Sequence, residues 1–125
     1  MADRALVIED HPVNLELTAL LLEQAGFEVI AAGTAEEGLT LARTEAPDVV
    51  VMDISLPGMD GLEATRILKA DPQTRGIPVL AATSHAMKGD EEEALAAGCD
   101  GFVAKPLDTR TFAETVAGLL RKDGS

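Results

Sequence analysis

The sequence predicts an α/β fold, a doubly wound parallel sheet of five strands flanked by five helices. Short runs rich in β-branched residues alternate with longer segments of helical period, which is typical of repeated βα units. Charged residues end several of the apolar runs, and a parallel sheet collects such residues at one edge. Because 125 residues suit one domain of common size, we expect a single domain over residues 1–125, without an output domain.

Five apolar runs of strand length are the predicted strands, each bounded by turn or helix signals. They extend over Ala5 to Glu9, Glu28 to Ala32, Val49 to Asp53, Val79 to Thr83 and Gly101 to Lys105.

The first helix is predicted from Pro12, which suits a first helical position, to Gly26, which ends it. We expect one apolar face on this helix, formed by Leu17, Leu20 and Leu21.

The second and third helices begin with capping-box spacings. Thr34 is followed three residues later by Glu37, and Asp60 by Glu63. The third helix is expected to end before Asp71-Pro72, because proline disfavours helix in the preceding residue.

The fourth helix, roughly Met87 to Ala97, is predicted to be the most weakly held, because its apolar residues are Leu95 and several alanines. Its acidic run, Asp90 to Glu93, is interpreted as a solvated face near the helix N-terminus, with a movable partner surface as the alternative. The fifth helix has the clearest period, with apolar residues at Phe112, Val116, Leu119 and Leu120.

Composition excludes several functions. The net charge of −12 disfavours direct binding to nucleic acid or to anionic lipid. The apolar runs are too short to span a bilayer, and no signal peptide is evident, so we expect a cytoplasmic protein without membrane insertion. The single Cys99 is expected to be a buried, inert thiol, because it has no partner for a disulfide and no zinc-ligand spacing.

Acidic and basic side chains from separate strand ends are expected to converge on one site. Glu9 and Asp10 end the first run, Asp53 the third, Thr83 the fourth and Lys105 the fifth. Each alone is more simply a turn former or a cap, but the full set indicates a site. Carboxylates so close repel each other unless a cation intervenes, and a few hard oxygen ligands suit Mg2+. Asp53 could then act as a nucleophile in phosphoryl transfer.

These residues, in this order and with Pro106 after the lysine, resemble the receiver domain of two-component response regulators over nearly the whole chain. The stretch 53–61, DISLPGMDG, is similar to the loop that follows the phosphorylated strand in that family. The segment 83–90, TSHAMKGD, resembles single-domain receivers of the DivK type and receivers of hybrid kinases. The resemblance implies a flavodoxin-like sheet of strand order 2-1-3-4-5.

The resemblance also implies residue roles. Asp53 is the expected phosphoacceptor, and Thr83 and Lys105 are expected to contact the phosphoryl group. Phe102 matches an aromatic residue that changes rotamer on activation, although simple core packing explains it equally well. The implied Mg2+ ligands are Asp10, Asp53 and the backbone carbonyl of Ser55, with Glu9 acting through water; Glu9 replaces the commoner Asp.

The implied function is a signalling switch that takes a phosphoryl group from a sensor histidine kinase or a histidine phosphotransfer protein and passes the signal to a downstream protein. No enzymatic activity is expected beyond the chain's own phosphorylation and dephosphorylation. The main alternative is an adaptor that binds partners without phosphorylation. A phosphohydrolase is disfavoured, because Ser55 stands where such enzymes usually carry a second acid, and a mononucleotide binder or a serine or cysteine hydrolase lacks its characteristic residues.

Two smaller points remain open in the sequence. His11 and His85 could border the site, but both are more simply polar loop residues without metal-ligand spacing. The peptide bond between Lys105 and Pro106 could be cis, which would fix the direction of the lysine.

Overall fold

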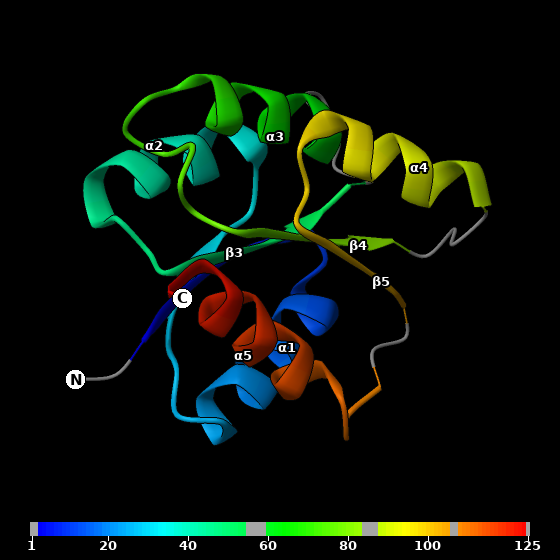
Figure 1. Ribbon diagram of the computed structural model, residues 1–125. Helices are drawn as coiled ribbons and strands as arrows, with labels where there is room; N and C mark the ends of the chain where they lie inside the picture. Colours follow the sequence, from blue (N-terminus) through cyan, green and yellow to red (C-terminus); the bar gives the residue numbers. More distant parts are fainter. Residues whose placement is uncertain (1–2, 55–59, 84–87, 106–107, 125) are drawn as a thin grey trace.

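The computed structural model describes residues 3–54, 60–83, 88–105 and 108–124, with side chains described for all of these except 88–90 and 121–124. It confirms the predicted fold: one parallel sheet has the strand order β2-β1-β3-β4-β5, and helices connect consecutive strands (Figure 1). The elements are β1 (Arg4–Ile8), α1 (Pro12–Gln24), β2 (Glu28–Ala32), α2 (Ala35–Glu45), β3 (Val49–Asp53), α3 (Gly61–Ala70), β4 (Val79–Thr83), α4 (Lys88–Ala97), β5 (Gly101–Ala104) and α5 (Phe112–Gly124).

The helices form two layers around the sheet. Helices α1 and α5 cover one face, and α2, α3 and α4 cover the other (Figure 1). Strands β3 and β4 are buried along their whole length, as expected for central strands of a parallel sheet that is covered on both faces. No helix in the ranges that the structure describes is long and apolar enough to cross a membrane.

The alternation of side chains along each strand divides the core in two. On β1, Leu6 and Ile8 belong to the cluster beneath α2–α4, whereas Val7 belongs to the cluster beneath α1 and α5. The second cluster includes Leu22 and Phe112, which are fully buried. Both clusters are mainly aliphatic, since the sequence has three Phe and no Trp or Tyr.

Both capping predictions are confirmed. The hydroxyl of Thr34 accepts a hydrogen bond of 3.1 Å from the backbone N–H of Glu37, and the carboxylate of Asp60 accepts one of 2.8 Å from the N–H of Glu63. The Glu37 carboxylate in turn accepts a bond from the N–H of Gly33. These side chains satisfy donors that have no partner within the helix, and they fix where α2 and α3 begin.

The prediction of one apolar face on α1 was wrong in part. Leu21 is buried, but Leu17 and Leu20 are 37% and 50% exposed. The buried stripe consists of Thr18, Leu21 and Leu22, whose spacing of three and four residues faces the sheet. Leu17 and Leu20 therefore lie on the neighbouring sector of the helix and face outward.

Helix α4 packs through small side chains. Its described buried residues are Ala94 and Ala97, and Leu95 is half exposed. Glu91 to Glu93 are exposed, which agrees with a solvated acidic face. The predicted first residue, Met87, lies outside the described residues. The weak hold on this helix stays a prediction, and the small buried side chains support it.

Candidate functional site

The predicted site residues lie at the carboxyl edge of the sheet, where β1, β3, β4 and β5 end. Strand β1 pairs with β3, and Ile8 is opposite Met52, so the next residues, Glu9 and Asp53, follow side by side. Glu9 and Lys105 were predicted to be the last residues of their strands. The structure places each one residue beyond the strand end, where the side chain is free to turn across the edge.

Three carboxylates converge at this edge, as the sequence predicted. Glu9, Asp10 and Asp53 each offer one oxygen atom, and these atoms all lie within 4.8 Å of one another. Glu9 and Asp53 are 4% and 5% exposed, whereas Asp10 is exposed. The cluster is therefore embedded in the protein on one side and open to solvent at Asp10.

Lys105 reaches into the cluster from β5. Its ammonium nitrogen lies 2.5 Å from a carboxylate oxygen of Glu9 and 3.4 Å from one of Asp53. Its backbone N–H donates to the carbonyl of Thr83, so its main chain is fixed against the end of β4. Thr83 itself is 2% exposed. Because β4 lies between β3 and β5, the lysine side chain has to cross the end of β4 to reach the acids.

The site carries more negative than positive charge. Burial is the main cause that raises the pKa of Glu9, and a hydrogen bond with Asp53 raises it further. The ammonium of Lys105 and the backbone N–H of His11 act in the opposite direction. One lysine cannot neutralise three carboxylates, so the site favours an additional cation or a proton.

The start of α3 packs directly against the end of β3. A Cβ atom on Gly61 would lie 2.5 Å from the carbonyl oxygen of Asp53 and 2.6 Å from the Cα atom of Ile54. Only glycine allows this close approach of two backbones. The N–H of Ile54 donates to the carbonyl of Ala82, which extends the β3–β4 pairing past Asp53. Asp53 thus stands on a rigid strand end.

Some predicted residues lie elsewhere or outside the described part. Phe102 is partly buried and packs against the core beneath α2–α4, which fits either interpretation of its role. His11 is exposed, and its contribution to the site is its backbone N–H, which the sequence did not indicate. Cys99 is buried as predicted, and burial raises the pKa of its thiol. The Ser55 carbonyl, His85 and the Lys105–Pro106 bond involve residues outside the described ranges.

The donor set fits a divalent cation of the Mg2+ type. The ligands are hard carboxylate oxygens, without nitrogen or sulfur donors, and the exposed side at Asp10 leaves room for water. Mg2+ usually keeps several waters and takes only one or two protein carboxylates directly. The Glu9, Asp10 and Asp53 cluster could therefore hold such an ion.

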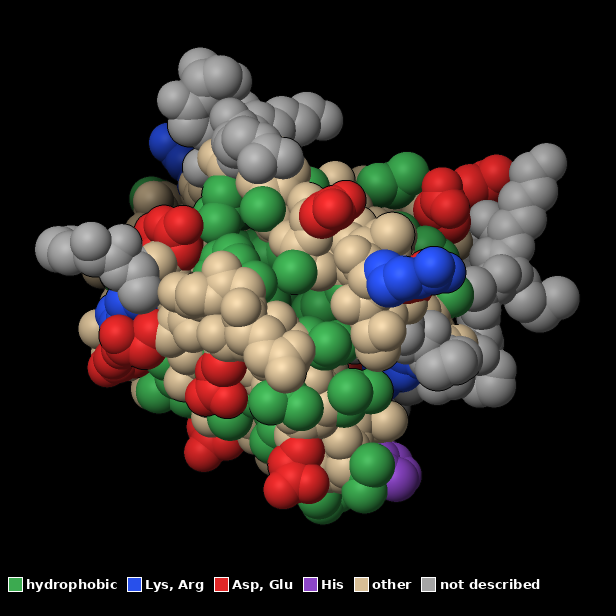
Figure 2. Space-filling model, turned by 90° about the horizontal axis from the view of Figure 1, so that it is seen from below, with side chains coloured by type: hydrophobic (Ala, Val, Ile, Leu, Met, Phe, Trp, Pro, Cys, Tyr) green, Lys and Arg blue, Asp and Glu red, His purple; other side chains and the backbone are tan. Residues whose placement is uncertain are grey.

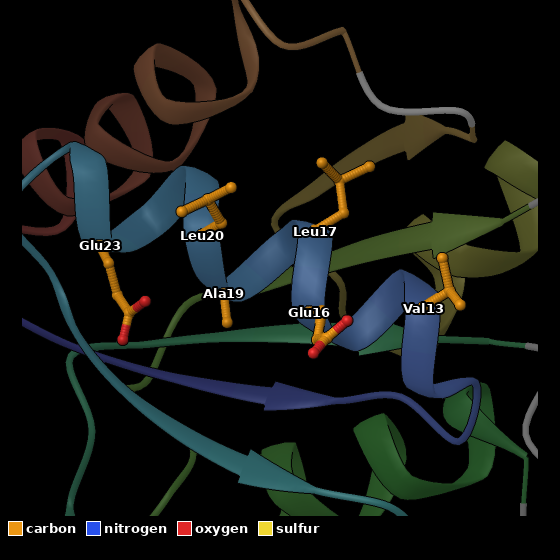
Figure 3. Close-up of a pocket in the computed structure, with 6 residues that line it drawn as sticks. All are labelled: Val13, Glu16, Leu17, Ala19, Leu20 and Glu23. Carbon is orange, nitrogen blue, oxygen red and sulfur yellow. The ribbon is translucent and has the colours of Figure 1, made fainter.

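A second surface lies next to this site and was not predicted. On the outer side of α1, exposed Val13, Leu17 and Leu20 form an apolar stripe, and Glu16 and Glu23 lie along one side of it (Figure 3). These residues, with Ala19, line a groove along the helix. Figure 2 shows hydrophobic side chains interspersed with acidic ones on the face of the molecule that α1 and α5 cover. We call the five exposed residues the α1 surface.

The sheet order and the acids and lysine at its carboxyl edge define a receiver domain. The chain belongs to the response regulator receiver domain family, whose model matches residues 5–117. Membership places it among the proteins of phosphorylation-dependent signalling in two-component systems, in which receivers pair with histidine kinases or other signalling partners.

Individual relatives agree with this assignment. The polar-differentiation response regulator DivK of Brucella ovis is 42% identical, with 96% of this chain and 98% of the relative covered. A CheY-like receiver domain protein from Methanospirillum hungatei JF-1 is 31% identical, with 99% and 98% covered and a TM-score of 0.89. The receiver domain of a sensor histidine kinase from Pseudomonas aeruginosa PAO1 is 33% identical over all of both chains, with a TM-score of 0.85. That structure has a magnesium ion coordinated in its active site cleft.

Proposed function

We propose that this chain is a cytoplasmic switch in which Asp53 accepts a phosphoryl group from a phosphohistidine of a sensor kinase or of a histidine phosphotransfer protein. The observation that carries the proposal is the position of the Asp53 carboxylate. It is 5% exposed, belongs to a cluster of three acids and lies 3.4 Å from the ammonium of Lys105. An aspartate in this setting can act as a nucleophile once nearby charges are neutralised.

In the proposed step, an Asp53 carboxylate oxygen attacks the phosphorus atom while the phosphorus–nitrogen bond to the donor histidine breaks. The products are an acyl phosphate on Asp53 and a free imidazole on the donor. Lys105 neutralises charge on the phosphoryl oxygens, and Thr83, at the end of β4, donates a hydrogen bond to one of them. The receiver thus promotes its own phosphorylation and dephosphorylation, and we propose no other enzymatic activity.

Mg2+ is the proposed cofactor. Asp10, Asp53 and the carbonyl of Ser55 would hold it directly, and Glu9 would act through water. When bound, the ion neutralises negative charge on the acids and on the phosphoryl group. The converging carboxylates and the magnesium ion in the Pseudomonas receiver support this assignment.

The proposed output is a change of surface shape that a downstream protein recognises. An acyl phosphate adds negative charge and oxygen acceptors, which would draw Thr83 toward Asp53 and allow Phe102 to move. Helix α4 follows β4 in the chain and buries only alanines among its described side chains. A small movement at the end of β4 would therefore be enough to shift the helix. The net charge of −12 supports a protein target and not DNA.

The α1 surface is the proposed docking place of the phosphoryl donor. Its apolar stripe has the spacing that an amphipathic partner helix contacts, and its acidic margins favour lysine or arginine on that helix. A second copy of this chain would bring the same acids against each other. Because α1 begins two residues after Asp10, a helix seated there lies beside the acceptor site.

The proposal is tested by the intact mass of the protein after incubation with Mg2+ and acetyl phosphate. The native chain is expected to gain one phosphoryl group, and Asp53→Asn is expected to gain none. Asp3→Asn, at the opposite end of β1, is the matched control and should behave as the native chain does. No gain in the native chain, repeated with phosphorylated histidine kinases, would favour the phosphorylation-independent adaptor.

A further inference from the structure

Two of the contacts of Glu9, one to each carboxylate oxygen, together fix its side chain. One oxygen accepts a bond of 3.2 Å from the backbone N–H of His11, and the other lies 2.5 Å from the ammonium of Lys105. The side chain is 4% exposed, so bulk water screens these contacts less than it screens ion pairs on the surface. Glu9 is thus a firmly placed anchor for the lysine.

The ammonium of Lys105 lies closer to Glu9 than to Asp53, the residue whose phosphoryl group it is proposed to neutralise. To neutralise a phosphoryl group on Asp53, the ammonium has to lie close to that residue. In the structure it is 3.4 Å from Asp53 but only 2.5 Å from Glu9. Glu9 is also proposed to contact a water of the cation, yet both of its oxygens already have partners. A shift of Lys105 from Glu9 toward Asp53, with which it already forms an ion pair, would leave a Glu9 oxygen available to a water of the cation.

We propose that Glu9 is a positioning residue that holds Lys105 in the cation-free protein and releases it toward Asp53 when a divalent cation enters the acidic cluster. The inference rests on the proposed function, because it concerns the same site. It adds one point: cation binding and the placement of Lys105 are a single coupled event, and Glu9 couples them.

Two physical arguments support the exchange. First, the ammonium occupies the same carboxylate cluster that a cation would enter, so the two positive charges repel each other and compete for Glu9. Second, the contact depends on length. Glu9 has one methylene group more than aspartate, and that extra reach is what brings its carboxylate to a lysine anchored beyond β4. An aspartate at this position keeps the charge, but its carboxylate starts one methylene group further from the lysine.

The test follows the Lys105 side chain directly. The chain has four lysines, at 69, 88, 105 and 122, so the side-chain Cε–Hε resonances form a small set in a carbon–proton NMR spectrum. Lys105→Arg identifies the resonance that belongs to Lys105. The protein is first freed of cations with a chelator and then titrated with Mg2+, while calorimetry measures Mg2+ binding to the same samples.

In the native protein, Mg2+ is expected to shift the Lys105 resonance, with the same midpoint as the calorimetric binding curve. In Glu9→Asp, the cation-free resonance should already differ from the native one and the Mg2+-dependent shift should be lost, while Mg2+ still binds. Glu28→Asp, the same change at an exposed residue at the amino end of β2, should match the native protein throughout. The position of the other lysine resonances shows that each variant is folded.

The inference is overturned by a Lys105 resonance that Mg2+ leaves unmoved in the native protein, or by native behaviour in Glu9→Asp. Neither result depends on phosphorylation. A native chain that shows the expected resonance shifts but gains no phosphoryl group from acetyl phosphate would instead overturn the proposed function, while the coupling through Glu9 would stand.

Discussion

A Cβ atom on Gly61 would lie 2.5 Å from the carbonyl oxygen of Asp53, closer than real Cβ contacts allow. The obstructing atom belongs to the backbone of β3, so it cannot move aside as a flexible side chain could. The first turn of α3 and the end of β3 therefore depend on this glycine.

Gly61→Ala is expected to lower the free energy of unfolding by about 1–3 kcal/mol, the usual range for overpacking. The same change should slow phosphorylation of Asp53 by acetyl phosphate, because it shifts the strand end. Urea denaturation and intact mass measure the two effects. Gly118→Ala in α5, where a Cβ atom meets nothing within 4 Å, is the control, and it should leave stability unchanged or raise it by up to about 1 kcal/mol. Equal stability of the two variants would contradict the prediction.

The raised pKa of Glu9 predicts a pH dependence of stability in the cation-free protein. The Glu9 carboxyl group keeps its proton to a higher pH in the folded state than in the unfolded chain. Its contribution to the free energy of unfolding is therefore complete below the unfolded pKa of about 4.3. It is lost as the pH rises through the raised folded pKa. Glu9→Gln should remove this loss of stability. The slope of the free energy of unfolding against pH should then differ between the variant and the native protein by at most about 1.4 kcal/mol per pH unit.

Urea denaturation of the native protein and of Glu9→Gln, from acidic to neutral pH and with chelator present, measures the difference between the two pH dependences. Mg2+ should suppress the effect in the native protein, because the cation favours ionised carboxylates. Parallel pH profiles for native and Glu9→Gln protein would refute it.

Two residues of α1, one buried and one exposed, should separate the effect on stability from the effect on partner recognition. Leu22 is fully buried, so Leu22→Ala is expected to cost about 2–5 kcal/mol of unfolding free energy. Leu20 is 50% exposed, so Leu20→Ala should stay within about 0.5 kcal/mol of the native value. Leu20→Ala should nevertheless slow phosphotransfer from phosphorylated histidine phosphotransfer domains. Transfer at the native rate from every such donor would argue against docking on the α1 surface.

Lys69 joins three segments at the edge of the sheet opposite the site. Its ammonium donates to the carbonyls of Arg75 and Ile77 and to the carboxylate of Asp100, which also accepts from the N–H of Val79. Lys69→Met is expected to lower the unfolding free energy by about 1–3 kcal/mol, because it leaves these acceptors without their charged donor.

The exposed pair of Arg43 and Asp71 is the comparison for Lys69. Arg43→Met should change stability by no more than about 1 kcal/mol, since water replaces a surface ion pair at little cost. Thermal or urea unfolding of both variants measures the two changes in stability. A larger loss of stability in Arg43→Met than in Lys69→Met would contradict the prediction that Lys69 matters more.

The sequence was sufficient for the elements of the fold and for the location of the site. Strands and helices follow from local periodicity, and the hydrogen bonds of Thr34 and Asp60 to their helices span only three residues. The convergence of Glu9, Asp10 and Asp53 could be predicted because parallel strands end at a common edge. Local chemistry and one topological rule account for all of this.

The tertiary structure decided which neighbours these residues have. Lys105 lies closer to Glu9 than to Asp53, and this depends on distances across β4 that no local pattern records. The outward direction of Leu17 and Leu20 depends on which sector of α1 the sheet covers, and apolar spacing alone left that undetermined. The need for Gly61 arises only where α3 meets β3. In each case the deciding interaction joins residues that the chain brings together only by folding, whereas the sequence by itself specified what each segment could form.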